Sequence, residues 1–396
     1  MAEQAIATGS GIDTRAVAGR LAGVGGAAVV VALTILGLGI IRDPDGPANL
    51  YAFLFDLLGQ GGTAGEVRDD GVDPLHAKLT IMVVALAIGI FGIWALFVGL
   101  NAATDLLGRR WAGRIRPYVF IAPAVVLLLG YLVVPAIATV VASFTERGAP
   151  GNTWGFVLTS PEMWLAFRNN LIWLIVGTGG SVGIGLLIAT LFDRIKREAL
   201  AKVFIFLPLA ISMVGAAVIW RFMYAWQPAG EEQVGLVNAV IQEVGGRPRV
   251  WMQVFEPIPV NTLLLIVIMI WLQTGFAMVV LSAALKGVSA EVLEAARMDG
   301  AGERQVFFRV VIPMIRGTII AVATTVAIAI LKVFDIVYVM TGGLHETEVM
   351  ANRMFSEMFT FGNFGRAAAI ATLLFLVVVP IMIVNIRNLR RQGIGR

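Results

Sequence analysis

The chain has 396 residues, of which 58% are hydrophobic and only 14% are charged, and its formal net charge is +4. Soluble domains carry about 25% charged residues, so this composition indicates a membrane protein and argues against a soluble enzyme or binding module. The sequence contains no cysteine, which excludes disulfides and thiolate metal sites. With only His76 and His345, a metal or acid–base site built from histidines is not expected.

Apolar runs of about 20 residues predict an all-α, polytopic membrane protein with about eight transmembrane helices. The first run follows Arg20 and is longer than a typical signal-peptide core, so we interpret it as a retained helix. The connecting segments are too short to hold a soluble domain. The eight predicted spans are 18–41, 79–100, 117–144, 170–192, 203–224, 261–284, 317–340 and 367–388.

The loops between these spans alternate in charge. Lysine and arginine gather in the loops 101–116, 193–202 and 285–316 and in the C-terminal tail, whereas acids prevail in 42–78 and 225–260. The positive-inside rule then predicts that both termini and the 285–316 loop are cytoplasmic and that the acidic loops face outward. This asymmetry accounts for the sequence pI near 9.6 without a nucleic-acid partner.

The polar segment 285–316 contains the most specific motif of the chain. Glu294–Ala296 is followed after three residues by Gly300, and nine further residues lead to Val310, Val311, Ile312 and Pro313. This spacing resembles the EAA loop of ABC-importer permeases. Val310 and Ile312 stand where Ile and Leu are more usual, which is a mild departure from the family pattern.

The same segment predicts two short helices. Ser289 is a candidate N-cap whose side-chain oxygen accepts from free backbone N–H groups, and 290–298 contains mostly good helix formers. Gly300 permits a positive φ or a close approach to a partner. A second helix is expected from about Glu303 to Pro313. The alternative is an ordinary cytoplasmic loop with Glu/Arg surface pairs, which contribute little to stability.

The resemblance implies that this loop carries a coupling helix that docks in a cleft of an ATPase subunit. It also implies a second homologous permease, two ATP-binding subunits and an extracytoplasmic solute-binding protein, in a bacterial cytoplasmic (inner) membrane. ATP and Mg would be bound by the partner subunits, and this chain would have no cofactor, metal or catalytic residue of its own. The docking residues implied by the motif are Glu294, Ala295, Ala296, Asp299 and Gly300.

Two further patterns concern nucleotide binding. None of the five lysines lies in the Gly-x4-Gly-Lys-Ser/Thr pattern of a P-loop, so the chain is not expected to hydrolyse ATP. The glycines of 177–185 lie inside an apolar span instead. We interpret them as a site of close helix packing, with Gly179 and Gly183 in small-xxx-small spacing.

Residues 109–396 resemble the six-helix permease core of type I ABC importers of carbohydrates, and 1–108 is expected to add two accessory transmembrane helices with an acidic outward loop. Phe120–Pro123 and Arg168–Asn170 also fit this family. The stretch 331–343, together with Ala351–Met354, is most similar to the alpha-glucoside branch. The resemblance therefore implies an importer of an alpha-glucoside or a related di- or oligosaccharide.

Other functions stay open at this stage. One alternative is an ABC-importer permease of the same kind for another solute, such as a polyol phosphate. An ATPase-independent secondary transporter would need titratable residues deep in several spans, but only Lys332 and Asp335 are charged within the later ones. A membrane enzyme would need a cluster of catalytic side chains at one membrane face, and the sequence contains no such pattern.

Polar and aromatic residues of the later spans predict a substrate path. Lys332 and Asp335 are three residues apart and are expected to share a helix face, either as a structural ion pair or with Asp335 beside Tyr338 on the path. Pro208 is expected to open the hydrogen-bond ladder of its span. Trp220 and Tyr224 are interpreted as membrane-interface anchors. The predicted path residues are Ser212, Trp271, Gln273, Thr274, Phe276, Asp335 and Tyr338.

Overall fold

The computed structural model describes residues 86, 92, 94, 96–101 and 104 and the ranges 109–145, 153–192, 198–228 and 230–393. The predicted span 18–41, the acidic loop 42–78 and most of 79–100 lie outside the described residues. Contacts divide the chain into two units, Met1–Val134 and Pro135–Arg396. The organisation into 1–108 and 109–396 stays a prediction.

The described residues form helices and connecting loops and contain no strand, which confirms the all-α fold class. The first helical run passes from one unit into the other and includes a five-residue π-helix (η1) between two α-helices. Its parts are α5 (Arg109–Leu128), η1 (Leu129–Val133) and α6 (Val134–Thr145).

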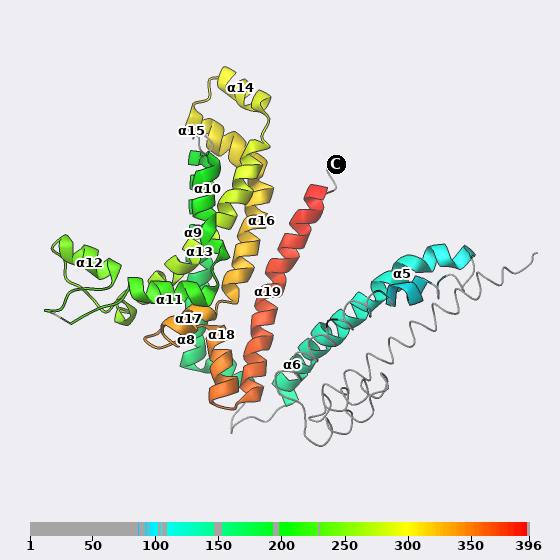
Figure 1. Ribbon diagram of the computed structural model, residues 1–396, viewed down its shortest axis with the longest axis horizontal. Helices are drawn as coiled ribbons and strands as arrows, with labels where there is room; N and C mark the ends of the chain where they lie inside the picture. The colour runs from blue at the N-terminus through cyan, green and yellow to red at the C-terminus, as the bar shows by residue number, and fades with distance from the viewer. Residues whose placement is uncertain are drawn as a thin grey trace, which may run out of the picture. The chain divides into compact units, whose positions relative to one another are not determined.

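The second unit continues with a series of α-helices and short π or 3-10 segments up to the long helix α13 (Figure 1). Some α-helices pass directly into π or 3-10 segments, labelled η. In chain order, the elements are α7 (Thr153–Thr159), α8 (Pro161–Ile172), η2 (Trp173–Gly177), α9 (Thr178–Phe192), α10 (Glu198–Phe206), η3 (Leu207–Ala210), α11 (Met213–Met223), α12 (Leu236–Glu243), η4 (Trp251–Gln253) and α13 (Val260–Lys286).

The remaining elements include the predicted coupling loop and the C-terminal helix. They are α14 (Ala290–Met298), α15 (Glu303–Val306), η5 (Phe307–Val311), α16 (Ile312–Leu331), α17 (Asp335–Met340), α18 (Met350–Phe355), η6 (Ser356–Thr360) and α19 (Phe364–Gly393).

Five helical runs of the described residues are long and apolar enough to cross a membrane. A sixth candidate is the pair Glu198–Ala210 and Met213–Met223, which is bent by 102° at the break between its halves. The five runs are Gly113–Thr145, Pro161–Phe192, Val260–Lys286, Glu303–Leu331 and Phe364–Arg387.

Two predicted spans are interrupted, and the first break lies at Pro208, which was expected to open the hydrogen-bond ladder of its span. The range 203–224 is not one straight helix, because η3 around Pro208 ends α10 and Ser212 begins α11 in a new direction. The range 317–340 is also interrupted, since α16 ends at Leu331 and α17 begins only at Asp335. In both cases hydropathy registers apolar composition but not the breaks in the backbone.

Helices α9, α13 and α16 pack side by side and supply most of the main core. Gly185 of α9 makes the close approach possible, because a Cβ atom there would lie 2.6 Å from Ala277 Cβ and 2.9 Å from Met278 N of α13. Gly179 and Gly183, which we expected to make this contact, have open space around them. The glycine-mediated packing is therefore present, but on a different helix face.

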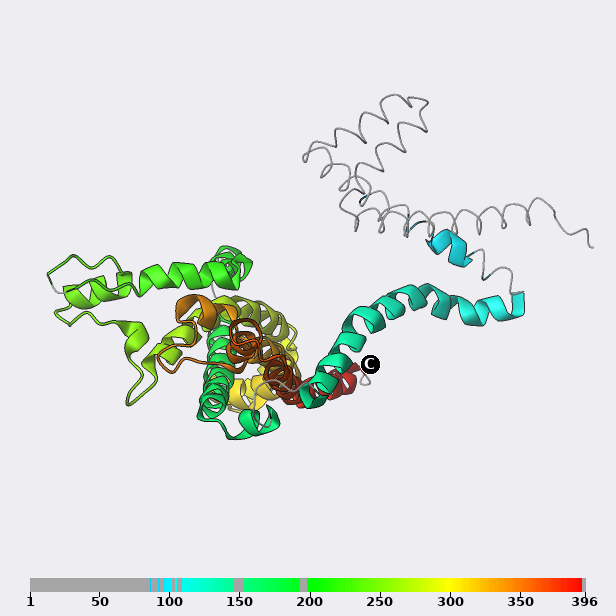
Figure 2. The same cartoon turned by 90° about the horizontal axis from the view of Figure 1, so that it is seen from below.

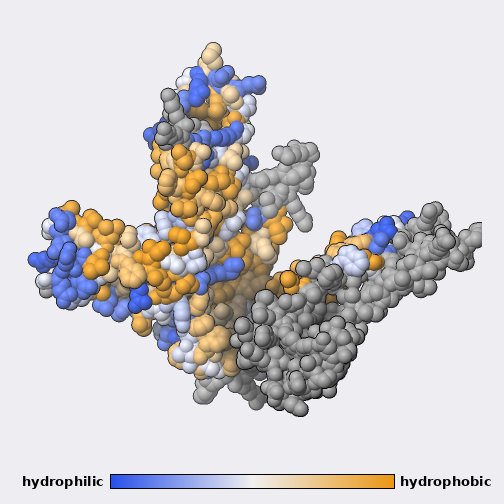
Figure 3. All heavy atoms as spheres, in the orientation of Figure 1, coloured by the Kyte–Doolittle hydropathy of each residue, from blue (hydrophilic) through white to orange (hydrophobic). Residues whose placement is uncertain are grey.

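Polar residues gather at one end of the second unit and on a part that projects from its side. Figure 3 shows hydrophilic side chains around α14 and α15 at one end and around α12 away from the bundle, with a hydrophobic zone between them. Helices α11 and α12 project to one side of the bundle, as both ribbon views show (Figures 1 and 2). Along the chain, the coupling loop precedes α16 and the α17–α18 region follows it, so the two lie at opposite ends of α16.

Candidate coupling loop and translocation path

The predicted coupling helix is present as α14, followed by a tight helix end. Gly300 adopts φ +85°, and its N–H donates to Arg297 O at 3.0 Å. The next N–H, of Ala301, donates to Ala296 O at 3.1 Å. A non-glycine residue is strained at this φ, so the glycine of the motif is required by the backbone itself.

One detail of the predicted coupling helix was wrong. Ser289 occupies the N-cap position, but its side chain makes no capping hydrogen bond. The second helix begins at Glu303 as expected, and there the Gln305 side chain accepts the Gly302 N–H at 3.1 Å. Within this loop, a side chain therefore satisfies a free backbone N–H at the start of the second helix and not of the first.

The motif residues are displayed on the surface. Glu294, Ala295 and Asp299 are exposed, Ala296 is half-buried, and Met298 is 88% exposed. A single exposed apolar side chain is common on protein surfaces, so Met298 alone does not mark a docking surface. The predicted docking residues thus form one projecting helix end.

An ion pair braces α14 against α15. Arg297 Nε lies 2.8 Å from Glu303 Oε1, and this carboxylate raises the pKa of the Arg297 guanidinium. A hollow of about 450 Å³ opens beside the pair and reaches Thr190 of α9 and Phe307 of η5. The pair is exposed and contributes little to stability, but it joins the end of α14 to the start of the helical run Glu303–Leu331.

Three aromatic residues considered near the path, Trp220, Tyr224 and Trp271, pack together. Trp271 of α13 meets Trp220 of α11 edge to face, with ring centroids 5.8 Å apart. Tyr224 packs on Trp220, is only 5% exposed, and donates from its hydroxyl to Leu264 O at 3.1 Å. Trp220 and Tyr224 are thus part of the packed core and not the interface anchors that we predicted.

The other predicted residues of α13 do not form one surface. Trp271 and Gln273 are about 200° apart around a helix, so they point to different sides. Thr274 is buried, and its hydroxyl donates to Ile270 O at 2.6 Å. Phe276 packs partly buried against the main core. The structure therefore does not bring Trp271, Gln273, Thr274 and Phe276 together around a shared space.

Ser212 and the charged pair also differ from expectation. The Ser212 side chain accepts the Gly215 N–H at 3.0 Å and caps α11. Lys332 is the C-cap residue that follows α16 and Asp335 begins α17, so they do not share a helix face. No ion pair joins Lys332 to Asp335 among the contacts of the described residues. Composition revealed the two charges, but not the break between them.

Tyr338 belongs to an aromatic surface that the sequence reasoning missed. It stacks on Phe334 with centroids 5.0 Å apart and meets Phe355 at 5.2 Å, while Phe359 extends the row at 4.8 Å from Phe355. Tyr338 remains 49% exposed and Asp335 is half-buried beside it in sequence. The signal was the i, i+4 spacing of Phe334 and Tyr338, repeated by Phe355 and Phe359.

The loop before α18 is fixed by buried asparagines. Asn169 Nδ2 donates to Glu346 O at 2.6 Å and to Glu348 O at 2.8 Å, while Asn261 Nδ2 donates to His345 O at 2.6 Å. His345 and Glu346 have positive φ values of 54° and 59°. Side-chain amides thus hold a backbone shape that non-glycine residues rarely adopt.

Charged side chains are buried at the same end of the unit. The fully buried Glu357 lies 2.7 Å from Arg353 Nη2 and accepts from Asn363 Nδ2 at 2.8 Å. Arg366 completes the group at 3.9 Å from the Glu357 carboxylate. Removing one member of this group would destabilise the protein, because a charge would be left buried without its partner.

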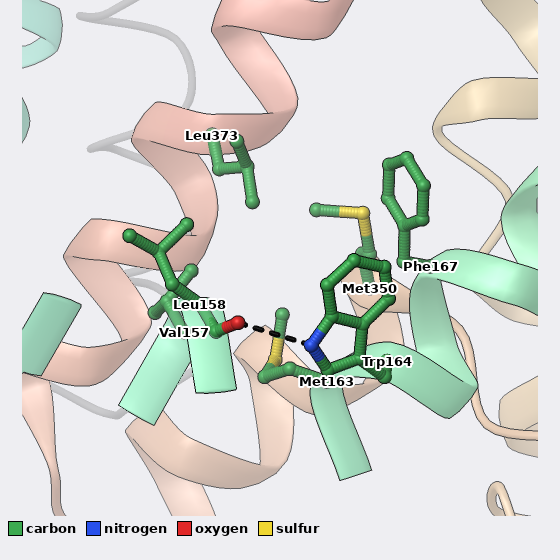
Figure 4. A pocket seen from close by; sticks show the side chains of 7 residues that line it. All are labelled: Val157, Leu158, Met163, Trp164, Phe167, Met350 and Leu373. Atoms are coloured by element: carbon green, nitrogen blue, oxygen red, sulfur yellow. Dashed lines mark hydrogen bonds between the residues drawn. The ribbon is translucent and has the colours of Figure 1, made fainter. Parts of the chain in front are cut away.

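An apolar pocket lies between α7, α8, α18 and α19 (Figure 4). Trp164 closes one side and donates from Nε1 to Leu158 O at 3.0 Å. The volume of the pocket is about 210 Å³. The predicted path residues lie elsewhere, so this pocket does not belong to the predicted path. Its lining residues are Val157, Leu158, Met163, Trp164, Phe167, Met350 and Leu373.

These features define a helical, multi-pass membrane protein with an exposed short helix, α14, at one end. The family model of binding-protein-dependent transport system inner membrane components matches residues 181–391. The chain belongs to this family and is a permease component of an ABC importer. The resemblance that was read from the Glu294–Pro313 motif is thereby confirmed.

Two curated relatives are similar over most of their length. The osmoprotective compounds uptake permease protein GgtC of Synechocystis is 52% identical over 278 residues, covering 69% of this chain and 98% of the relative. The alpha-glucoside transport system permease protein AglF of Rhizobium meliloti is 47% identical over 292 residues, covering 72% and 86%.

The fold is also similar to that of a chain in a solved ABC transporter. A chain of a bacterial ABC transporter involved in the import of the acidic polysaccharide alginate has a TM-score of 0.61 at 20% identity. The match covers 72% of this chain and 99% of the solved one. The same transporter in complex with an alginate pentasaccharide-bound periplasmic protein gives the same TM-score. At this identity the likeness concerns the fold alone.

Proposed function

We propose that this chain is one permease subunit of an ATP-driven, binding-protein-dependent sugar importer. Its substrate would be an alpha-glucoside or a related di- or oligosaccharide, and the chain would form half of the translocation path. The observation that carries the proposal is the exposed α14, whose motif residues project from the bundle. The similarity to the alpha-glucoside permease AglF supports the substrate class.

The proposed complex contains a second homologous permease, two ATPase subunits and an extracytoplasmic solute-binding protein. ATP and Mg would be bound by the ATPases, and this chain would supply no catalytic group. Glu294, Ala295, Ala296, Asp299 and Gly300 would enter the ATPase cleft. Closure of the two ATPases would then move α14 and the helices joined to it as a rigid body.

The membrane arrangement is also part of the proposal. The five long helices and the bent α10–α11 pair would together form the six-span core. Both termini and α14 would be cytoplasmic, because Lys and Arg prevail in the loops of that side. The 341–366 region, at the opposite end from α14, would then receive the binding protein (Figure 1).

The geometry favours one part of the predicted substrate path over the rest. Tyr338, with Phe334 and Phe355, presents an exposed aromatic surface, and Asp335 lies at the start of the same helix. Aromatic faces suit the C–H surface of a sugar and a carboxylate accepts from its hydroxyls. Ser212 and Thr274 already bond within their own elements, so they are weaker candidates.

The direct test is affinity purification of the tagged chain from native membranes, followed by mass spectrometry and reconstitution in vesicles. We expect an ATPase and a second permease to co-purify, and we expect ATP-dependent uptake of radiolabelled maltose with the binding protein present. A catalytically inactive ATPase subunit is the matched control. Uptake by the chain alone, without ATP, would instead establish a secondary transporter.

The similarity to GgtC favours one alternative substrate, an osmoprotective compound. Calorimetry on the binding protein that belongs to the complex separates the two substrate classes. Binding of maltose or another alpha-glucoside supports the leading proposal. Binding of a polyol or polyol phosphate, with no heat from maltose, would assign the importer to the alternative.

A further inference from the structure

A charged cluster joins the start of α10 to the end of α13. The Glu198 carboxylate accepts a hydrogen bond from Lys202 of its own helix and another from Lys286 of α13 at 2.8 Å. Lys202 also donates to Ser282, which is only 2% exposed. One carboxylate thus connects two ammonium groups across the interface between two helices.

The position of the cluster in the chain is informative. Lys286 is the last residue of α13, and α14 begins four residues later at Ala290. Glu198 is the first residue of α10. The cluster therefore connects the root of the coupling loop to the first half of the broken span.

The other end of α10 is also held tightly against α13. A Cβ atom at Gly275 would lie 2.6 Å from Ile205 O and 2.8 Å from Phe206 Cα, so the two backbones are in direct contact there. With charges at one end and backbone contact at the other, α10 has little freedom to move independently of α13. The two helices are built to behave as one rigid element.

Beyond α10 the chain turns by 102° into α11. Helix α11 packs on α17, and Ala216 and Tyr224 share the main core with Ile336 and Val337. Tyr338 is the next residue of the same helix, α17. A displacement of α10 therefore reaches the aromatic surface through packed side chains.

We propose that Glu198 is a positioning residue that locks α10 to the end of α13, so that the broken span moves together with the coupling loop. This inference rests on the proposed function, because the motion comes from the partner ATPases. It assigns to Glu198, Lys202 and Lys286 a role in coupling ATP hydrolysis to transport. These residues lie outside the Glu294–Pro313 motif.

The test uses the complete importer, reconstituted in vesicles with its co-purified partners. ATP hydrolysis and uptake of radiolabelled maltose are measured in the same vesicles for Glu198→Gln and Lys286→Met. Changes within a coupling network alter coupling by about 2- to 30-fold, so we expect the ATP consumed per sugar to rise within that range. Arg387→Met, which removes an exposed cation near the end of α19, is the matched control.

A second pair of variants separates coupling from simple stability. The chain contains no cysteine, so Glu198→Cys with Lys286→Cys can be bridged selectively by a short bis-maleimide. We expect the unbridged double variant to be uncoupled and the bridged one to recover uptake. The wild-type complex treated with the same reagent controls for cysteines in the partner subunits.

Several outcomes would overturn the inference. If the bridge abolishes uptake while hydrolysis continues, α10 and α13 must separate during the cycle. An unchanged ratio of ATP to sugar in both single variants would remove the coupling role, and failure of both to assemble would show a purely structural one. Absence of ATP-dependent uptake by the wild-type complex would instead refute the proposed function itself.

Discussion

Asn170 and Met350 are 180 positions apart in sequence, yet Asn170 Oδ1 accepts the Met350 N–H at 2.8 Å inside the protein. The same amide donates to Leu331 O at 3.4 Å. Asn170 therefore connects α8 to the last residue of α16 and to the first of α18. This single buried side chain fixes the relative positions of three elements around the aromatic surface of Tyr338.

We expect Asn170→Ala to destabilise the protein, because it leaves the Met350 N–H and Leu331 carbonyl without this partner. The unfolding free energy should fall by about 1–3 kcal/mol per unsatisfied buried group. Thermal unfolding of the detergent-solubilised protein measures this loss. Gln242→Ala, at an exposed position of α12, is the control and should shift stability by less than about 0.5 kcal/mol.

The end of the coupling helix supplies a matched pair of glycine variants. Gly300 has φ +85°, whereas Gly302 has φ −68°, and both have open space for a Cβ. Gly300→Ala should therefore cost about 1 kcal/mol through backbone strain alone, and Gly302→Ala should cost much less. ATPase affinity, measured by co-purification, should fall for Gly300→Ala only. Equal affinities in the two variants would argue against a required helix end.

The charge of the docking helix gives a separate prediction. Glu294 is exposed, so Glu294→Lys should leave folding and membrane insertion intact. If α14 enters an ATPase cleft, the reversed charge should lower ATPase assembly and ATP-dependent uptake. Glu291→Lys, on the same helix but outside the motif, is the comparison. Full uptake by the Glu294 variant would count against the docking role.

Close packing of α9 and α13 predicts that an alanine destabilises the protein at Gly185 but not at Gly183. Gly185→Ala places a methyl group 2.6 Å from Ala277 Cβ and 2.9 Å from Met278 N, which forces the helices apart. Overpacking of this kind costs about 1–3 kcal/mol. Gly183→Ala meets no atom within 4 Å and should not change the melting temperature. Comparable melting temperatures for the two variants would show that the helices adjust freely.

The loop before α18 should make stability depend on pH. Burial raises the pKa of Glu348, although hydrogen bonds from Asn352 and Val349 N oppose this effect. The folded state therefore favours the protonated form, so this contribution is present below the unfolded pKa near 4.5 and is lost as pH rises through the higher folded value. Glu348→Gln should flatten that part of the melting profile. An unchanged slope would show that Glu348 ionises normally.

The apolar runs and the Glu294–Pro313 motif were sufficient to predict most of the spans and the family. An average hydropathy over about 20 residues is sufficient to find spans, because each must satisfy its backbone and face lipid regardless of its neighbours. The Glu294–Pro313 spacing identified the family and located α14 within its bounds. The positive φ at Gly300 also follows locally, since a helix end commonly uses glycine for that turn.

Other features depended on contacts between distant segments. The break at Lys332 and the role of Asn170 involve partners that lie far apart in sequence, so no local pattern announces them. Likewise, Gly179 and Gly183 match a packing spacing, but Gly185 meets α13 because the rotation of α9 is set by all its neighbours.

Periodicity says which residues share a helix face, and tertiary packing decides what that face touches. The sequence by itself determined a helical, membrane-spanning permease with an exposed polar loop that carries the family motif, because those properties are local sums of hydropathy, charge and spacing. Only the tertiary structure decided which side chains cap helices, which lie in the core, and which remain open around Tyr338.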